Sequence, residues 1–247
     1  MIPIVQRKYI ISLIQQINKT VHDNDIVICV VNDGNNKIEN YLNKYLPKEI
    51  ELLNLKNNLC FAGANNAGWK LLINKYPSIK YLGSINDDTD PQDQWLKYLV
   101  QSMETNSNIG ACGPVMITYA NKFFKRKIKY TSTWKLGTKK TPMIIDKKKI
   151  TSDTYVSVLG GFCFLAKAKA LLQIDYFDVK YQNSCEDIDL CLKLRKSNWN
   201  LVVSSNSLVV HKCGKSRFKT KNYHAKISNS RKLLISKWGN NLEKYNL

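Results

Sequence analysis

The stretch Tyr81–Pro91 reads YLGSINDDTDP, and the rest of the chain is interpreted outward from it. Its first half is a short apolar run of the length and bounding typical of a buried strand. Carboxylates then follow at Asp87, Asp88 and Asp90. Because like charges repel, this cluster indicates a nearby positive charge, and its oxygens suit Mg²⁺ or Mn²⁺. A second interpretation, compatible with the first, is a solvated turn in which Asp90 caps the next helix and Pro91 begins it.

Apolar runs and segments with helical spacing alternate around this stretch. Residues 25–31 are apolar almost throughout, as in strands of a parallel sheet that helices cover on both faces. The alternation predicts an α/β fold, a Rossmann-like and mainly parallel central sheet flanked by helices. The expected strands are residues 2–5, 25–31, 50–55, 81–85 and 109–117, and the expected helices are residues 7–21, 38–45, 62–76 and 95–100.

Polar residues follow three of these strands, at Asn32-Asp33, Asn57-Asn58 and Asp87-Asp88. Ligands of open α/β sheets bind beyond the carboxyl ends of the strands, so we expect these ends to form one site. The first strand is not followed by G-x-G-x-x-G, and G-x-x-x-x-G-K-[ST] is absent from the sequence. A dinucleotide-binding fold and a P-loop are therefore disfavoured.

The composition limits the partners and the compartment. A net charge of +19, from 38 basic and 19 acidic residues, predicts attraction to nucleic acid, an anionic membrane face or phosphorylated substrates. The seven cysteines lack C-x-x-C spacing, which is typical of reduced thiols in a cytosolic protein. The sequence has neither a long apolar run nor signal-peptide features. We therefore expect a cytoplasmic protein, either free or peripheral at a membrane.

The second half of the chain is less regular. Residues 118–153 are rich in lysine and without clear periodicity, which fits either a solvated excursion or a basic flap over the site. Within the apolar run 155–166, Gly160-Gly161 indicates a bulge or a close backbone approach. We expect a helix capped by Ser184, with acidic residues in its first turn, and a late strand at 200–210. The basic tail predicts an amphipathic helix that either packs on the domain or contacts a membrane surface.

Four motifs in order point to a known family. Residues 58–68 (NLCFAGANNAG) are similar to N-x-G-F-A-G-A-N-N-x-G, with Cys60 in place of a usual glycine. Residues 86–89 (NDDT) resemble a metal-binding D-x-D motif, residues 186–195 (EDIDLCLKLR) resemble E-D-x-D-L-x-x-R-x-R, and residues 211–216 (HKCGKS) resemble H-x-x-G-x-S. Together they resemble family 2 glycosyltransferases of the GT-A fold, especially the rhamnosyltransferase-like branch.

This resemblance implies transfer of a sugar from a nucleoside diphosphate donor, UDP- or dTDP-linked, to an acceptor hydroxyl with inversion. Mn²⁺ or Mg²⁺ would be the cofactor, and a glycan, lipid-linked glycan or protein glycan the acceptor. Residues 1–117 would form the nucleotide-sugar-binding half and residues 118–216 the acceptor-binding, catalytic half, including the basic flap 118–153. Residues 217–247 would form the basic C-terminal helix or tail.

The resemblance also assigns roles to individual residues. Asp33 would hold the base and ribose, Asp88 the metal ion against the diphosphate, and His211 a further metal or phosphate contact. Asp187 would be the general base, because an inverting single displacement needs one base and no covalent nucleophile. The remaining implied residues are Pro3, Val5, Asn58, Asn65 and Asp87 for the nucleotide sugar, and Gly161 and Glu186 for the acceptor.

Two alternatives remain open at this point. A basic protein could bind nucleic acid through phosphate contacts, although zinc-finger spacing and an RNP-type motif are both missing from the sequence. The chain could also be a catalytically inactive transferase-like domain retained for binding. The sequence does not identify the sugar, the acceptor or the oligomeric state.

Overall fold

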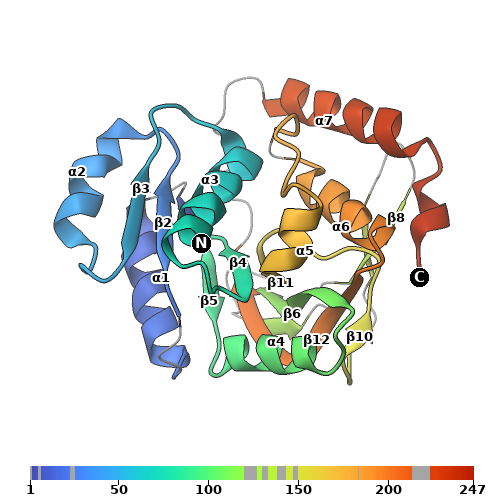
Figure 1. Ribbon diagram of the computed structural model, residues 1–247, viewed down its shortest axis with the longest axis horizontal. Coiled ribbons are helices and arrows are strands. Elements are labelled where there is room, and N and C mark those ends of the chain that lie inside the picture. The colour runs from blue at the N-terminus through green and yellow to red at the C-terminus, as the bar shows by residue number, and fades with distance from the viewer. Residues whose placement is uncertain are drawn as a thin grey trace.

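The computed structural model describes residues 2–4, 7–22, 26–119, 127–129, 133–137, 143–146, 150–182, 184–212 and 223–247. Two main sheets lie side by side, with helices over their faces (Figure 1). The expected α/β class, a central sheet flanked by helices, is confirmed. Half of the expected basic flap 118–153 lies outside the described residues. Its described parts include strands β7 (Lys127–Lys129), β8 (Thr133–Leu136) and β9 (Met143–Asp146). Strands β8 and β9 form a further sheet of two strands.

The first sheet belongs to the N-terminal part of the chain and is wholly parallel. Its order is β1-β2-β3, formed by β1 (Ile2–Ile4), β2 (Cys29–Asn32) and β3 (Glu51–Asn54). The middle strand begins four residues later than its apolar run suggested, at Cys29. The helices that accompany these strands are α1 (Arg7–Thr20), α2 (Asn36–Tyr45) and α3 (Cys60–Lys75).

The second sheet is mixed, not mainly parallel. Its main path is β10-β12-β6-β11-β4, with β5 and β7 pairing at its margins. Strand β6 runs parallel to β12, but β11 runs antiparallel to both β4 and β6. These strands are β4 (Tyr81–Ile85), β5 (Thr89–Pro91), β6 (Ile109–Tyr119), β10 (Thr154–Tyr155), β11 (Cys163–Lys167) and β12 (Asn200–His211).

Two expected helix starts differ in the structure. Asp90 and Pro91 do not begin a helix, because they belong to β5 and pair with β12. Proline is tolerated there because β5 is a marginal strand, where a missing N–H donor costs little. The following helix, α4 (Trp95–Glu104), begins after Gln94. Helix α6 (Glu186–Lys196) begins after Cys185, which has a left-handed backbone, and Ser184 does not cap it.

The core consists of two buried apolar clusters. In the larger cluster, the Trp69 and Phe177 rings are stacked at a centroid distance of 5.3 Å. This contact fixes α3 against the chain that follows α5 (Ala168–Gln173). The six described cysteines are all buried in this interior, and Cys213 lies outside the described residues.

The C-terminal helix α7 (Tyr223–Trp238) is held against α6 by one buried carboxylate. Asp189 is fully buried and accepts from Trp238 Nε1 at 2.7 Å and from Tyr181 Oη at 3.2 Å. Lys237 Nζ lies 2.9 Å from Asp189 Oδ1 and 3.1 Å from Asp178 Oδ2. Burial alone would lower the pKa of Lys237, but these two carboxylates outweigh it and raise that pKa.

The position of α7 matches one of the two arrangements expected for the basic tail, packing on the domain. The basic helix packs on the domain through Asp189, and the 3₁₀ helix η2 (Leu242–Tyr245) follows it. Within the described residues, no helix has the length and apolar content needed to cross a membrane. Peripheral membrane contact and a cytoplasmic location stay predictions.

Substituting Asp189→Ala should destabilise the protein by about 3–5 kcal/mol, because it leaves the Lys237 ammonium and the Trp238 N–H without their buried partner. Asp178→Ala is the matched control, since the Asp178 side chain is 21% exposed and the Asp189 side chain 0% exposed. Urea unfolding of both variants checks this. Equal losses for the two variants would contradict the assigned role of Asp189.

Candidate active site

The predicted donor side of the site is the turn after β2. Asp33 Oδ1 accepts the Leu59 N–H at 2.6 Å, and Asn58 Nδ2 donates to the Asp33 carbonyl at 3.2 Å. Two of the three predicted polar strand ends therefore meet. Gly34 makes this approach possible, because its φ is +71° and a Cβ there would lie 2.5 Å from the backbone of Asn57 and Asn58.

The Asp33 carboxylate sits at the amino end of α3. Burial raises its pKa, and the backbone N–H groups of Leu59 and Cys60 lower it, with a net rise. A raised pKa in the folded state means that the folded protein binds this proton more tightly than the unfolded chain does. The ionised form of Asp33 therefore costs stability in the folded protein.

Cys60 occupies the position where the family motif usually has glycine. Its φ is 59°, in the left-handed region that glycine adopts without steric cost. Its N–H bonds Asn58 Oδ1 at 3.2 Å, which holds the turn in place. Cys60 is 8% exposed. It therefore combines a left-handed backbone with a buried thiol at the edge of the predicted site.

The metal-motif carboxylates follow β4 and are almost buried. Asp87 is 5% exposed and Asp88 is 7% exposed. His211 Nε2 lies 3.2 Å from Asp88 Oδ1, and the Lys212 N–H donates to the Asp88 carbonyl at 3.0 Å. This contact arises because β5 pairs antiparallel with the end of β12, with Thr89 opposite His211.

Asp88 and His211 form a donor set that fits a divalent cation completed by phosphate oxygens. Mg²⁺ in phosphate-transfer sites is typically held by one or two carboxylates plus substrate phosphates. Within the described ranges, no cluster of three or more His, Cys, Asp or Glu side chains could hold a metal alone. The residues therefore fit an ion that binds together with a diphosphate and not as a separate structural centre.

The predicted acceptor side of the site is the start of α6. Asp187 Oδ2 accepts the Gly161 N–H at 3.0 Å, and Asp187 Oδ1 accepts the Ile188 N–H at 2.9 Å. A Cβ on Gly161 would lie 3.3 Å from the Asp187 Cβ and 3.5 Å from Phe61 Cε1. Glycine at this position thus lets the backbone approach the carboxylate. Glu186, the preceding residue, is 8% exposed.

The dipeptide Gly161-Phe162 connects the two sides. The Phe162 carbonyl accepts the Asn86 N–H at 2.8 Å, next to the metal motif. The Phe162 ring stacks on His211 with a centroid distance of 5.0 Å. Since the Gly161 N–H binds Asp187, this dipeptide links the segment with the predicted base to the segments with the predicted metal ligands.

The other predicted residues are placed less directly. Asn65 has no exposed surface, and its Nδ2 donates to the Phe61 carbonyl within α3 at 2.7 Å. Pro3 pairs with Val31 in register, and Val5 lies outside the described residues, as do residues 213–216 of the last motif. The binding roles of these residues stay predictions.

Sequence reasoning missed Asn66. Its Oδ1 accepts the Phe177 N–H at 3.1 Å, and its Nδ2 donates to the Phe177 carbonyl at 2.9 Å. This pair of hydrogen bonds between the Asn66 amide and the Phe177 backbone joins α3 to the segment after α5. The second asparagine of the GANN sequence was visible as a motif residue, but its partner 111 residues away was not.

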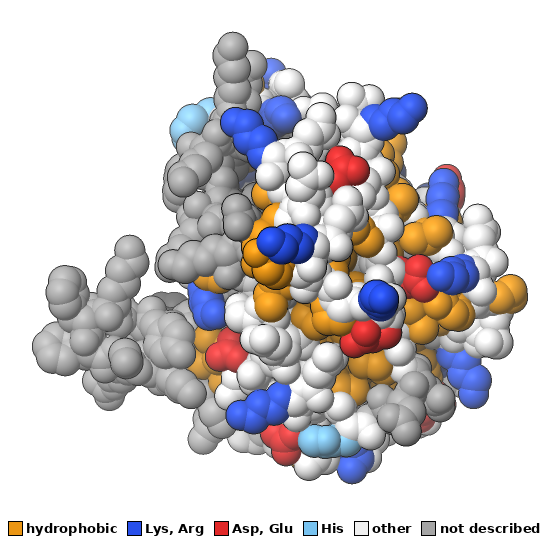
Figure 2. All heavy atoms as spheres, turned by 90° about the vertical axis from the view of Figure 1, so that its left-hand side faces the viewer, with side chains coloured by type: hydrophobic (Ala, Val, Ile, Leu, Met, Phe, Trp, Pro, Cys, Tyr) orange, Lys and Arg blue, Asp and Glu red, His pale blue; other side chains and the backbone are white. Residues whose placement is uncertain are grey.

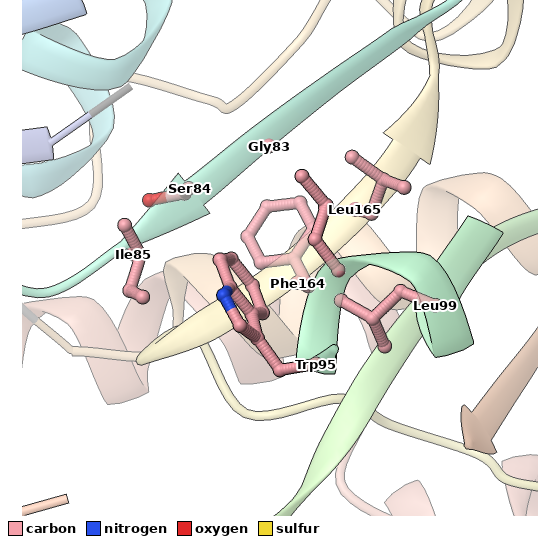
Figure 3. A pocket seen from close by; sticks show the side chains of 8 residues that line it. Gly83, Ser84, Ile85, Trp95, Leu99, Phe164 and Leu165 are labelled. Carbon is pink, nitrogen blue, oxygen red and sulfur yellow. The ribbon is translucent and has the colours of Figure 1, made fainter. Parts of the chain in front are cut away.

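A small cavity of about 60 Å³ lies behind β4, between β11 and α4 (Figure 3). Its walls are mainly apolar and include Leu99 and Phe164. Ser84 Oγ and Trp95 Nε1 also line it, and neither finds a hydrogen-bond partner within the part of the chain that the structure describes. No acidic side chain lines this cavity, so it is separate from the predicted site acids.

The comparisons with known proteins agree with this geometry. The family model described as Glycosyl transferase family 2 matches residues 1–172. No curated protein matches the sequence. The solved structure of GalNAc-T7 with UDP, GalNAc and Mn²⁺ is similar, with a TM-score of 0.72 and 13% identity, over 86% of this chain and 43% of that chain.

Two structures of Staphylococcus aureus TarS residues 1–349 are also similar. The one in complex with UDP has a TM-score of 0.61 and 14% identity, over 87% of this chain and 60% of that chain. The other has a TM-score of 0.57 and 15% identity, over 85% and 59%. The chain thus spans about half the length of these neighbours, and at such identities the likeness shows the fold alone.

The left-handed backbone of Cys60 leads to a stability prediction. Cys60→Gly should be more stable than Cys60→Ala by about 1 kcal/mol, because alanine keeps the steric cost of a positive φ and glycine removes it. Both variants lose the thiol, so their difference isolates the backbone term. Chemical denaturation of the pair measures it, and an alanine variant at least as stable as the glycine variant would contradict the assignment.

Proposed function

The chain belongs to glycosyl transferase family 2, and from this membership and the site geometry we propose that it is an inverting glycosyltransferase acting on a nucleoside diphosphate sugar. The observation that carries the proposal is the Gly161-Phe162 segment, which binds Asp187 on one side and contacts Asn86 and His211 on the other. A donor-binding acid and a base facing one cleft are what a single displacement at a sugar carbon requires. The rhamnosyltransferase-like branch is a narrower proposal that rests on the motifs alone.

For the donor, we favour a uridine diphosphate sugar, with a dTDP sugar as the alternative. GalNAc-T7 and TarS, which share the fold, were both solved with UDP. Asp33 lies in the turn after β2, where its carboxylate can accept from a pyrimidine N–H and from ribose hydroxyls. Asn58 would fix this turn by its bond to the Asp33 backbone.

Asp88 and His211 would hold a divalent ion, Mn²⁺ or Mg²⁺, which when bound supplies charge neutralisation for the departing diphosphate. The 3.2 Å contact between His211 Nε2 and Asp88 Oδ1 places the two side chains next to each other. Asp87 would add negative charge beside them. Phe162, stacked on His211, would keep the imidazole plane in one orientation.

Asp187 would accept the proton of the acceptor hydroxyl. The acceptor oxygen forms the new bond to the anomeric carbon as the bond to the diphosphate oxygen breaks, and the proton moves to the carboxylate. Two backbone N–H groups, of Gly161 and Ile188, hold Asp187 in one orientation. A positioned base of this kind contributes roughly 10²–10⁴-fold to the rate. Glu186, one residue earlier, would contact the acceptor.

The two alternatives are less well supported. Figure 2 shows the face at the α2 end, where lysine and arginine side chains lie singly among other residues and not in a continuous stripe. Nucleic-acid-binding proteins typically gather such charges in one stripe, and the described residues of this face do not form one. Against an inactive domain, Asp88 and Asp187 are both present, and Gly161 leaves room for the Asp187 side chain, whose Cβ would lie 3.3 Å from a Cβ added at Gly161.

Asp187→Asn tests the proposed base. With Mn²⁺ and the UDP- or dTDP-sugar that the wild type turns over best, transfer or donor hydrolysis should fall by about 10²–10⁴-fold. Affinity for UDP should remain, because in the described part of the chain Asp187 accepts from Gly161 and Ile188, away from the turn that carries Asp33. Asp175→Asn, an exposed acid outside the site, is the matched control and should keep full activity. An Asp187→Asn variant with wild-type turnover would rule out the assigned mechanism.

A further inference from the structure

The described site is crowded with acids, although its proposed substrate is an anion. The predicted site residues include five acids, Asp33, Asp87, Asp88, Glu186 and Asp187. Of these, Asp87, Asp88 and Glu186 are buried. Carboxylates and a diphosphate repel one another most strongly where water is partly excluded. A cation placed close to the bound phosphates would offset this repulsion.

Lys226, on the first half of α7, is a candidate for such a cation. Its Nζ lies 4.0 Å from the Cys60 Sγ, and its side chain is partly buried. The α7 helix is far from Cys60 in sequence, so this contact brings the C-terminal segment directly over the turn that carries Asp33. The Cys60 thiol experiences burial, which raises its pKa, then Lys226, which lowers it, and Asp33 and Glu186, which raise it.

Lys226 has no counter-ion of its own in the part of the chain that the structure describes. The ion pairs of the described residues join other side chains. The Lys226 ammonium contacts the Cys60 thiol instead. A partly buried ammonium without a carboxylate partner is unfavourable. It is, however, what a binding site for an anion requires before that anion arrives.

The helix that carries Lys226 is fixed at two points. Asp189 binds the Lys237 and Trp238 side chains near its end, and Ser230 Oγ accepts the Gln182 N–H at 3.0 Å. Ser230 is one helical turn beyond Lys226 and is 2% exposed. The ammonium is therefore presented by a docked helix and not by an unattached tail.

We propose that Lys226 is a donor-binding residue that contacts the diphosphate group of the nucleotide sugar. This inference rests on the proposed function and deepens it, because it assigns the C-terminal helix a place in the donor site. The metal ligands lie at the end of β12 and Lys226 lies over the amino end of α3, so the diphosphate would be neutralised from two sides.

Calorimetry with UDP in the presence of Mn²⁺ tests the inference, with uridine as a second ligand that lacks the phosphates. Lys226→Ala should weaken UDP binding by about tenfold or more, as expected for a lost bond to a charged group. Lys226→Arg should recover most of the affinity, and uridine binding should not change. Lys232→Ala, an exposed lysine on the same helix, is the matched control. The pair dTDP and thymidine is measured in parallel.

The possible failures are distinct. If the wild type binds UDP or dTDP and Lys226→Ala binds it equally well, the Lys226 assignment is wrong and the proposed function stands. If Lys226→Ala weakens nucleoside and nucleotide equally, the lysine supports the fold and does not contact phosphate. If the wild type binds neither nucleotide with Mn²⁺, the proposed function fails and this inference fails with it.

Discussion

The Gly161-Phe162 segment is the constraint on which the rest of the site depends. Its N–H holds Asp187, its next carbonyl receives the Asn86 N–H, and the aromatic ring in between stacks on His211. These contacts come from four distant parts of the sequence. Because both hydrogen bonds use backbone groups of adjacent residues, neither acid-bearing segment can shift far without moving the other. The fold therefore sets the separation between donor and acceptor sides through one short piece of backbone.

Keeping this arrangement has a conformational cost at the same places. Cys60 and Cys185 each adopt a positive φ immediately at the start of a helix that borders the site, α3 and α6. Strained backbone of this kind persists only where surrounding contacts enforce it, and it gathers at functional sites. The enforcing contacts here are the buried links that fix each helix, Asn66 to Phe177 for α3 and Asp189 to α7 for α6.

Sequence patterns predict much of this molecule and fail for identifiable reasons. The alternation of apolar runs located most elements up to β6, and the motifs predicted that Asp88 and His211 belong together, which their 3.2 Å contact supports. The direction of β11 could not be predicted, because pairing is decided across the sheet and not within the strand. Asp90 and Pro91 carry a strong helix-start signal locally, but pairing with β12 overrides it. Lys226 resembled any other lysine of a basic tail, since only the docking of α7 brings it to Cys60.

The central claim is that Asp88 and His211 hold a divalent ion with a nucleoside diphosphate, facing Asp187. A crystal structure grown with UDP and Mn²⁺, with anomalous diffraction data, tests it most directly. The account predicts an anomalous peak in contact with the Asp88 carboxylate and with phosphate oxygens, and with Asp187 across the cleft from the phosphates. A metal peak elsewhere on the protein, or a diphosphate bound away from Asp88, would contradict it.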